Sequence, residues 1–523
     1  MGLGLLLLVS VGKENLYLSA QPEITFFKIA YRRHTNYSIE PTPQYFKTTP
    51  DFGRRCTINV AKNADLIGMS YICVELPNIQ LENTSASNKQ FAWVDKIGLA
   101  LINFIEIEIG GSVIERNYGD WLNIWSEITI STGQKPGYNK MIGNIPKLTK
   151  FSKTKESYKL YIPLYFWFCQ DTGLALPLIA LTHNDIKIHV EFNDIEKCYK
   201  LSPSHYITLS DNFCIFKPGE IFSQTSQNIK HIGEFVSFDP VTQNLYYNPV
   251  KGKFIVPSKL NDSYLVLTGN ISKTTNNIKP NSVVVKDQDY FRFNKPSLLN
   301  AFLVINYIYL DNFERFNFLN NSHEYLIPIV QNIPDQVMYS TNVTYKLPLS
   351  NPVKLLIWRG ILLSNSNSND NFNYTTFPYT EKEEEIVNKN TLVINSINRM
   401  EPNSFEYYTY LPKYQYKIKS TQKGIYFYSF GLNPMELQPS GSLNFSKVDD
   451  AYILFKLNKN INYQNPVTLR GYSIQYNILR TSNGIGGLQF SIWKFKKTFW
   501  KFKKNFLKVS FAFITMLNYY VHS

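Results

Sequence analysis

Two stretches of the chain share one arrangement of hydrophobic and polar residues. Residues 161–192, YIPLYFWFCQDTGLALPLIALTHNDIKIHVEF, begin with an apolar run, break in a turn-rich middle and end in strict alternation. Residues 424–457 repeat this order, from the aromatic run GIYFYSF through LNPMELQPSGSLN to DDAYILFKL. Each stretch predicts a strand, a connector and a half-buried second strand. Because the stretches lie about 260 residues apart, the length of a large all-β domain, we interpret the chain as one β-sandwich used twice.

A tight β-hairpin is predicted at residues 104–114, FIEIEIGGSVI. The isoleucines alternate with Glu106 and Glu108, so the isoleucines face a core and the glutamates face water. Gly110 and Gly111 supply the positive-φ residues that such a turn needs. The alternation makes the two glutamates a solvated strand face rather than a catalytic pair of acids.

One amphipathic helix is predicted after this hairpin, capped by Asp120 and covering one end of a sheet. The apolar side chains that fall near one side of the helix are Trp121, Leu122, Trp125 and Ile128. Further strands are predicted at 24–31, on both sides of a turn within 57–76, and at 264–267, 303–309, 353–359 and 391–397.

Proline residues and polar loops indicate where the chain divides into domains and loops. Residues 193–230, with Pro203 and Pro218, predict a domain junction, and the polar segment 364–390 predicts an exposed tower-like loop. The expected fold is all-β: two tandem jelly-roll β-sandwich domains with short accessory helices and long loops. The predicted division is an N-terminal arm at 1–18, a first jelly roll at 19–215, a second jelly roll at 216–482 and a C-terminal extension at 483–523.

Composition supports a large folded protein. The 523 residues are 44% hydrophobic, 15% aromatic and 18% charged, which is enough to bury two cores. Half of the formal charge of +14 belongs to one terminal segment, because seven lysines lie between Lys494 and Lys508 and no acidic residue follows Asp450. The body is only mildly basic, so we expect no specific nucleic-acid binding.

The cysteines and the N-terminus indicate the environment of the protein. Cys56, Cys73, Cys169, Cys198 and Cys214 show neither CxxC nor metal-ligand spacing, which predicts reduced thiols and synthesis inside a cell. The apolar run near the N-terminus is short for a membrane span and lacks the basic start of a signal peptide. We expect an apolar arm that packs against a neighbour.

No motif for catalysis, a cofactor or a metal is found: GxxxxGK[ST], GxSxG and HExxH are all absent. His183 and His189 flank one strand without further ligands nearby, which favours surface or hydrogen-bonded histidines over a metal site. The glycine-rich segment 484–487 is interpreted as a flexible exit from the last strand. The sequence therefore predicts no enzyme, no cofactor and no metal.

Two surface features leave alternatives open. The basic cluster at Tyr31-Arg32-Arg33-His34 suits either an acidic partner or a strand-end turn paired with local carboxylates, and the second is favoured. Glycosylation sequons occur at Asn261, Asn342 and Asn373, a motif too common to carry weight.

Four blocks of the sequence resemble one family: residues 14–38, 107–127, 163–192 and 427–450. In the same order, they are similar to the major capsid proteins of nucleocytoplasmic large DNA viruses, which are icosahedral double-stranded DNA viruses. The resemblance spans about residues 12–488. It implies a double jelly roll, a homotrimer and a capsomer with a nearly hexagonal footprint that contacts neighbouring capsomers and minor capsid proteins. It further implies a place in the virion after synthesis and assembly in the host cytoplasm.

Two alternatives remain beside the major capsid protein: a paralogous minor capsid or penton-type protein, and a β-sandwich that binds or cleaves glycans, because jelly rolls also serve as lectins.

The C-terminus departs from the family, which usually ends near residue 488. Residues 493–513 carry a heptad in register, WKFKKTF, WKFKKNF and LKVSFAF, which predicts a basic amphipathic helix. Three interpretations stay open for this extension: contact with an anionic inner viral membrane, docking on another capsid component, or no selected role.

Overall fold

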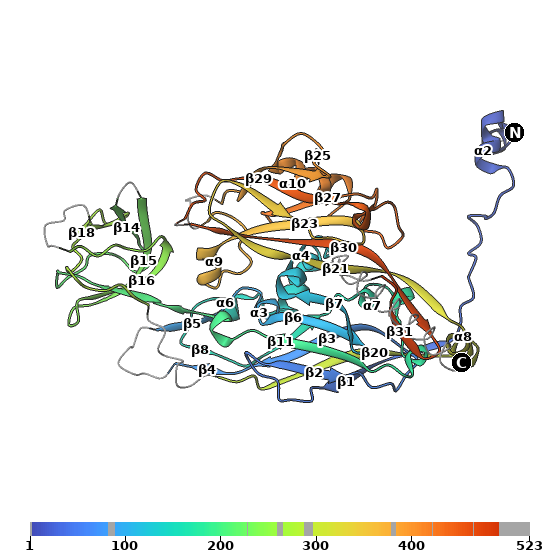
Figure 1. Ribbon diagram of the computed structural model, residues 1–523, viewed down its shortest axis with the longest axis horizontal. Coiled ribbons are helices and arrows are strands. Elements are labelled where there is room, and N and C mark those ends of the chain that lie inside the picture. The colour runs from blue at the N-terminus through green and yellow to red at the C-terminus, as the bar shows by residue number, and fades with distance from the viewer. Residues whose placement is uncertain are drawn as a thin grey trace, which may run out of the picture.

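The computed structural model describes residues 3–81, 89–226, 229–258, 265–286, 296–377, 383–420, 422–463 and 465–490. Figure 1 shows two β-sandwiches stacked one above the other, with a smaller sheet projecting at one end. The C-terminal extension from residue 491 lies outside the described residues.

The first sandwich, called barrel 1, consists of two antiparallel sheets. One has the order β1 (Tyr37–Tyr45), β20 (Asn300–Leu310), β3 (Leu66–Leu76), with β9 (Tyr158–Pro163) and β10 (Leu176–Pro177) paired to β3. The other has the order β2 (Arg55–Asn59), β11 (Ile186–Phe192), β6 (Ile102–Ile109), β7 (Ser112–Tyr118). Chain order and pairing match a jelly roll.

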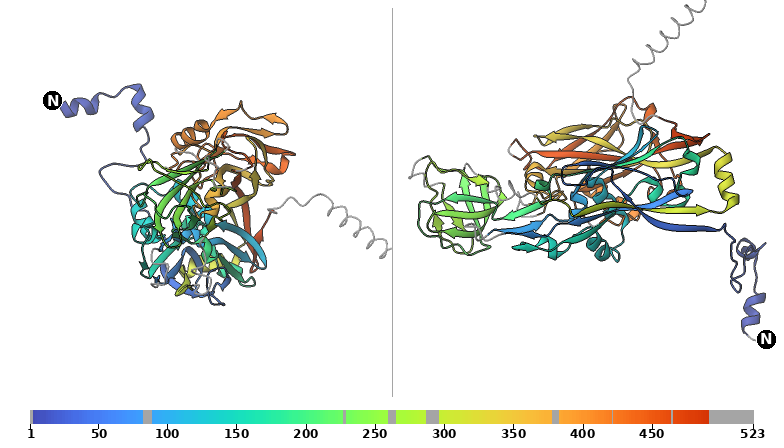
Figure 2. Two further views of the ribbon diagram at one scale, coloured as in Figure 1. Left: turned by 90° about the vertical axis from the view of Figure 1, so that its left-hand side faces the viewer. Right: turned by 90° about the horizontal axis from the view of Figure 1, so that it is seen from below.

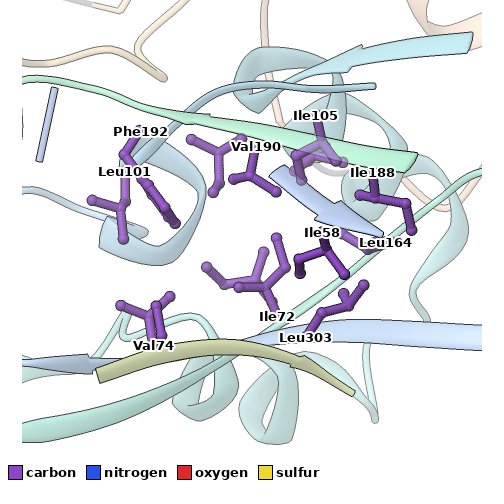
Figure 3. Packing of buried hydrophobic residues seen from close by; sticks show 14 of the residues in the cluster. Ile58, Ile72, Val74, Leu101, Ile105, Leu164, Ile188, Val190, Phe192 and Leu303 are labelled. Atoms are coloured by element: carbon purple, nitrogen blue, oxygen red, sulfur yellow. The ribbon is translucent and has the colours of Figure 1, made fainter. Parts of the chain in front are cut away.

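The predicted alternation builds the core of barrel 1. Ile188 on β11 is fully buried and points toward the opposite sheet, where Ile72 and Leu303 are equally buried (Figure 3). The predicted hairpin is confirmed: Gly110 and Gly111 have φ of 56° and 83° between β6 and β7.

Barrel 2 repeats the same strand order. One sheet runs β21 (His323–Met338), β30 (Val467–Ser482), β23 (Pro352–Leu362), β27 (Ile425–Ser429), and the other runs β22 (Asn342–Lys346), β29 (Ala451–Leu457), β24 (Val387–Ile394), β25 (Ile397–Asn398). Position by position, these orders equal β1-β20-β3-β9 and β2-β11-β6-β7 of barrel 1. The predicted use of one sandwich twice, as a double jelly roll, is confirmed.

A third sheet interrupts barrel 1 between β11 and β20. Its seven strands are β13 (His205–Thr208), β14 (Ile221–Ser226), β15 (Ile229–Asp239), β16 (Asn244–Lys251), β17 (Leu267–Gly269), β18 (Thr275–Asn276) and β19 (Val285–Lys286). This insertion sheet has its own core around Phe222, Leu245 and Tyr247, and it is the green lobe of Figure 1. The predicted boundary at 215/216 therefore needs correction, because β20 closes barrel 1 by pairing with both β1 and β3.

Short elements complete the fold. The helices are α1 (Leu3–Val9), α2 (Leu16–Ser19), α3 (Ile97–Ala100), α4 (Gly119–Thr129), α5 (Lys135–Met141), α6 (Pro146–Thr149), α7 (Trp167–Gln170), α8 (Asn312–Asn320), α9 (Leu363–Asn367) and α10 (Phe405–Gln415). Minor strands are β4 (Ile79–Gln80), β5 (Gln90–Trp93), β8 (Thr154–Lys155), β12 (Tyr199–Ser202), β26 (Asn403–Ser404), β28 (Leu443–Asn444) and β31 (Ile485–Leu488).

Two predictions about projecting segments were wrong. Residues 24–31 form no strand: Phe26 and Phe27 are 92% and 98% exposed, and α1 and α2 lie away from both barrels (Figure 2). In its described parts, residues 364–377 and 383–390, the polar segment does not project as a tower, because Tyr374 and Ile386 are buried against the barrels. The polar composition of this segment led to the wrong prediction, since a few buried aromatic and aliphatic side chains are enough to hold an otherwise polar loop against the barrels.

The glycine-rich segment after the last long strand is also ordered. Asn483 and Gly484 have φ of 52° and 77°, and they turn the chain from β30 into β31, which pairs with it. The predicted flexible exit is therefore a closed hairpin.

The buried alternation predicts the effect of a cavity in barrel 1. Replacing Ile188 by alanine should lower the free energy of unfolding by about 2–5 kcal/mol, because the side chain is buried between both sheets. Denaturant unfolding measures this. The matched change at exposed Ile397 should cost less than about 0.5 kcal/mol, and equal losses at both sites would contradict the assigned core.

Candidate assembly interface

Helix α4 joins the two barrels. Its sequence carries apolar residues on two faces: Leu122 enters the core of barrel 1, whereas Trp121, Ile124 and Ile128 pack on the outer face of the β21-β30-β23-β27 sheet. That face presents Leu355, Ile357, Ile425, Phe427, Tyr472 and Ile474, all buried. Figure 1 shows α4 between the barrels. The predicted helix is confirmed, but it covers the outer face of a barrel 2 sheet rather than one end of a sheet.

Asp120 anchors this contact by a buried network. Its carboxylate accepts hydrogen bonds from Arg359 Nε at 2.9 Å, from the Tyr472 hydroxyl at 3.0 Å and from the Tyr374 hydroxyl. The guanidinium of Arg470 lies 3.9 Å away and binds Asp335 through two nitrogens. The predicted helix cap is corrected: Asp120 lies in the first turn after the N-cap residue and is turned toward barrel 2.

The charges of this network fix the ionisation of Asp120. Burial by itself raises the pKa of the carboxyl, but the guanidiniums of Arg359 and Arg470 and the Tyr374 hydroxyl outweigh it, so the pKa lies below 3.8. Since the folded pKa is depressed, the carboxylate stabilises the protein above about pH 4, and this contribution is lost as the pH falls through the folded pKa. The network specifies how the barrels are oriented, while the apolar face of α4 supplies most of the burial.

A second buried acid, Glu115 on β7, lies near the same boundary. It is 2% exposed, and its Oε2 accepts a hydrogen bond of 3.4 Å from the Trp167 backbone N–H. Burial raises its pKa to about 8, against smaller opposing effects of backbone hydrogen bonds from Trp167 and Val330. The carboxyl is therefore protonated at neutral pH.

A polar groove opens beside the network, with a volume of about 560 Å³. Its charged lining includes Asp120, Asp335, Arg359 and Arg470, which already bind one another as acid–base pairs. Groups engaged in this way hold the barrels together rather than activate a substrate.

The residues that the sequence suggested for chemistry serve structure. His189 binds Thr57 Oγ1 at 2.8 Å and Glu108 Oε2 at 3.1 Å, so the predicted hydrogen-bonded histidine is confirmed. Glu106 was expected to face water but is 1% exposed, because the guanidiniums of Arg55 and Arg116 cover its carboxylate. Within the described ranges, no group of three or more His, Cys, Asp or Glu residues could hold a metal ion.

The thiols lie inside the fold: Cys56, Cys73 and Cys198 are buried, while Cys169 and Cys214 are half-buried. Burial raises the pKa of Cys169 to about 12, so it remains a thiol at neutral pH.

The remaining surface features stay open. Among the ion pairs between described residues, none includes Arg32 or Arg33, and the pairing of that cluster with local carboxylates stays a prediction. Asn342 lies exposed at the start of β22, whereas the Asn373 amide donates to Asp370 and to the Phe377 carbonyl; Asn261 lies outside the described residues. In the part of the chain described, no helix has the length and hydropathy required to cross a bilayer.

Comparison with known proteins shows which family has this architecture. Residues 25–237 match a family model of the major capsid protein N-terminus, and residues 314–487 match one of the large eukaryotic DNA virus major capsid protein. Probable capsid protein 4 of Acanthamoeba polyphaga mimivirus is 36% identical over 512 residues, covering 93% of this chain and 99% of that protein.

The chain belongs to the family of major capsid proteins of large eukaryotic DNA viruses.

Other relatives of this capsid protein agree. The major capsid protein of Phaeocystis pouchetii virus is 27% identical, covering 93% of this chain and 99% of that one. The fold matches the Faustovirus major capsid protein with a TM-score of 0.62 at 13% identity, covering 90% of this chain and 94% of that chain. It matches the PBCV-1 virus capsid with a TM-score of 0.61 at 20% identity, covering 89% and 100%. As a capsid protein, the chain is a structural component of the virion and not an enzyme.

Removing one charge from the interface network should destabilise this capsid protein strongly. The substitution D120N leaves Arg359 buried without its counter-ion, and we expect a loss of about 3–5 kcal/mol in the free energy of unfolding. Denaturant unfolding at pH 7 tests this, with D449N on an exposed turn as the control. A D120N loss no larger than that of D449N would refute the role of the network.

The raised pKa of Glu115 predicts a pH dependence of opposite sign. Between about pH 4.5 and pH 8 the folded state holds a proton that the unfolded state has released, so stability falls by about 1.4 kcal/mol per pH unit from this group. E115Q removes this dependence. The stability difference, variant minus wild type, should rise steadily from pH 5 to pH 8 in urea unfolding, and a constant difference would show that Glu115 does not titrate there.

Proposed function

We propose that this capsid protein forms a homotrimer with a nearly hexagonal outline and that such trimers tile an icosahedral shell. The observation that carries the proposal is that the two barrels have the same strand order and are stacked one on the other, with α4 packed between them. Three chains with two similar barrels each provide six similar wedges, so a threefold assembly can occupy a sixfold lattice position. Contacts with neighbouring capsomers and minor capsid proteins then add up over the shell.

The two ends of the barrels carry different elements, which supports an orientation in the shell. The insertion sheet projects at one end, and β31, α8 and the N-terminal arm lie at the other (Figures 1 and 2). We propose that the insertion sheet faces outward and the opposite end faces the interior. On this orientation β31, the last strand of the described residues, lies at the interior end, and contact of the sequence from residue 491 with an inner membrane stays a prediction. Assembly in the host cytoplasm also stays a prediction.

The N-terminal segment supports an intermolecular role. Residues 3–36 bury no side chain in the single chain, although they include Leu6, Phe27 and Tyr31, which are 56%, 98% and 86% exposed. Apolar side chains in such number are typical of a contact made only in an assembly. We propose that this arm packs against a neighbouring subunit, as its sequence predicts.

The mass of the purified protein tests the proposal. Size-exclusion chromatography with light scattering should give a particle of three times the chain mass of 60.7 kDa. A monodisperse monomer at micromolar concentration would contradict the proposal, and a dimer would exclude the threefold arrangement.

A further inference from the structure

Helix α10 is the counterpart of α4 in barrel 2. Both helices have 11 residues, and each lies between matching strands: α4 between β7 and β9, and α10 between β25 and β27. At the fourth position, Leu122 of α4 enters the core of barrel 1 and Tyr408 of α10 enters the core of barrel 2. The two helices therefore sit on their own barrels in the same rotational setting.

The outward faces of the two helices carry apolar residues at the same positions. Positions three, six and ten are Trp121, Ile124 and Ile128 in α4, and Tyr407, Tyr410 and Tyr414 in α10. In α4 these side chains are at most 1% exposed, because barrel 2 covers them. In α10, Tyr410 and Tyr414 are 56% and 86% exposed. The face that is covered on α4 is thus open on α10 at positions six and ten, while Tyr407 at position three packs partly against the core of barrel 2.

The sheets show the complementary asymmetry. The outer face of β21-β30-β23-β27 is buried beneath α4. The matching face of β1-β20-β3-β9 in barrel 1 exposes Tyr45, Met69 and Tyr161, at 66%, 60% and 37%. Helix α8 covers only one corner of it, through Phe318 near Ile308 and Leu66.

Each helix–sheet pair also combines an acid on the helix with a cation on the sheet, although the cations lie on strands that do not match: β23 and β30 in barrel 2, and β9 in barrel 1. Asp120, at the second position of α4, meets Arg359 and Arg470 on the barrel 2 sheet. The second position of α10 is Glu406, which is exposed, and the open sheet of barrel 1 carries exposed Lys159 with its amine 5.6 Å from the centre of the Phe302 ring. An acid on the helix and a cation on the sheet are present in both pairs.

We propose that α10 of one subunit packs on the outer face of the β1-β20-β3-β9 sheet of the next subunit, as α4 packs on the β21-β30-β23-β27 sheet within one chain. In Figure 1 the two open surfaces lie at opposite sides of the stack, with β1 and β20 below and α10 above. A contact between different surfaces of successive copies is heterologous, and it closes into a ring when its rotation permits. The occupant of each surface is therefore a second copy of this chain. This inference rests on the proposed trimer and names its interface.

Two variants of the full chain test the interface by complementation. Y410D places a charge on α10, and M69D places one on the sheet of barrel 1; both residues are exposed in the single chain, so folding should be retained, as thermal unfolding of the monomer verifies. F316D on α8 is the control, since Phe316 is a comparably exposed aromatic residue, at 69%, on the helix that covers only one corner of this sheet and is not part of the proposed contact with α10. We expect Y410D and M69D each to raise the trimer dissociation constant at least about tenfold, and F316D to leave it within about twofold.

Mixing the two variants decides which surfaces meet. In an equimolar mixture, α10 of M69D and the sheet of Y410D are both intact, so native mass spectrometry should show dimers of one M69D chain and one Y410D chain, whereas each variant alone should be mostly monomeric. Trimers of Y410D or M69D as stable as those of F316D, or a mixture without heterodimers, would overturn the interface while the wild-type trimer still stood. A monomeric wild type would instead overturn the proposed function.

Discussion

The burial of helix α4 between the barrels is the contact on which the rest of the structure depends. Each barrel has a core of its own, and the barrels also share apolar contacts, because Ile327, Ile329 and Leu479 of barrel 2 are buried in the cluster that forms the core of barrel 1. The outer face of the β21-β30-β23-β27 sheet is nevertheless apolar across Leu355, Ile357 and Phe427, and it would be exposed without α4. Covering this face fixes one barrel on the other, so that the chain behaves as a rigid pair of wedges.

Polar groups at this boundary restrict how the barrels can be placed. Asp120 requires Arg359, Tyr374 and Tyr472 to converge on one carboxylate, and a shift of the helix by one turn would leave several buried groups unpaired. Apolar packing alone tolerates such a shift more easily. The network thus fixes the relative orientation of the barrels, and a repeating shell needs this orientation to be the same in every subunit.

The edge strand of barrel 1 also limits which contacts can form. Pro41 and Pro43 on β1 lack the backbone N–H groups that an added strand would use, so strand addition at this edge is disfavoured.

The sequence predicted the parts of the fold that rest on local patterns. Alternation in 186–192 and 104–114 located buried strands and a hairpin, and the repeated order of aromatic run, turns and strand at 161–192 and 424–457 predicted the duplication. The division of the chain was less accessible, because β20 returns to barrel 1 only after the insertion sheet, and pairing over so long a separation leaves no local mark. Glu106 was misplaced for a related reason: the arginines that cover it come from β2 and β7 rather than from its own strand.

The residues of the interface between the barrels could be identified only from the structure. Asp120 has the sequence signal of a helix cap, and only the position of Arg359, on the other barrel, shows its actual role. The likeness of α4 and α10 is equally hidden, since GDWLNIWSEIT and FEYYTYLPKYQ share almost no residues and correspond only through their place in the two barrels.

The central claim is that two like barrels, held in one orientation by α4, give a threefold particle a nearly sixfold shape. Electron microscopy of purified particles viewed end-on measures this most directly, through the rotational power spectrum of class averages calculated without imposed symmetry. If the barrels are oriented in this way, the spectrum should contain a sixfold component comparable to or larger than the threefold one. A spectrum with a threefold component alone would contradict it.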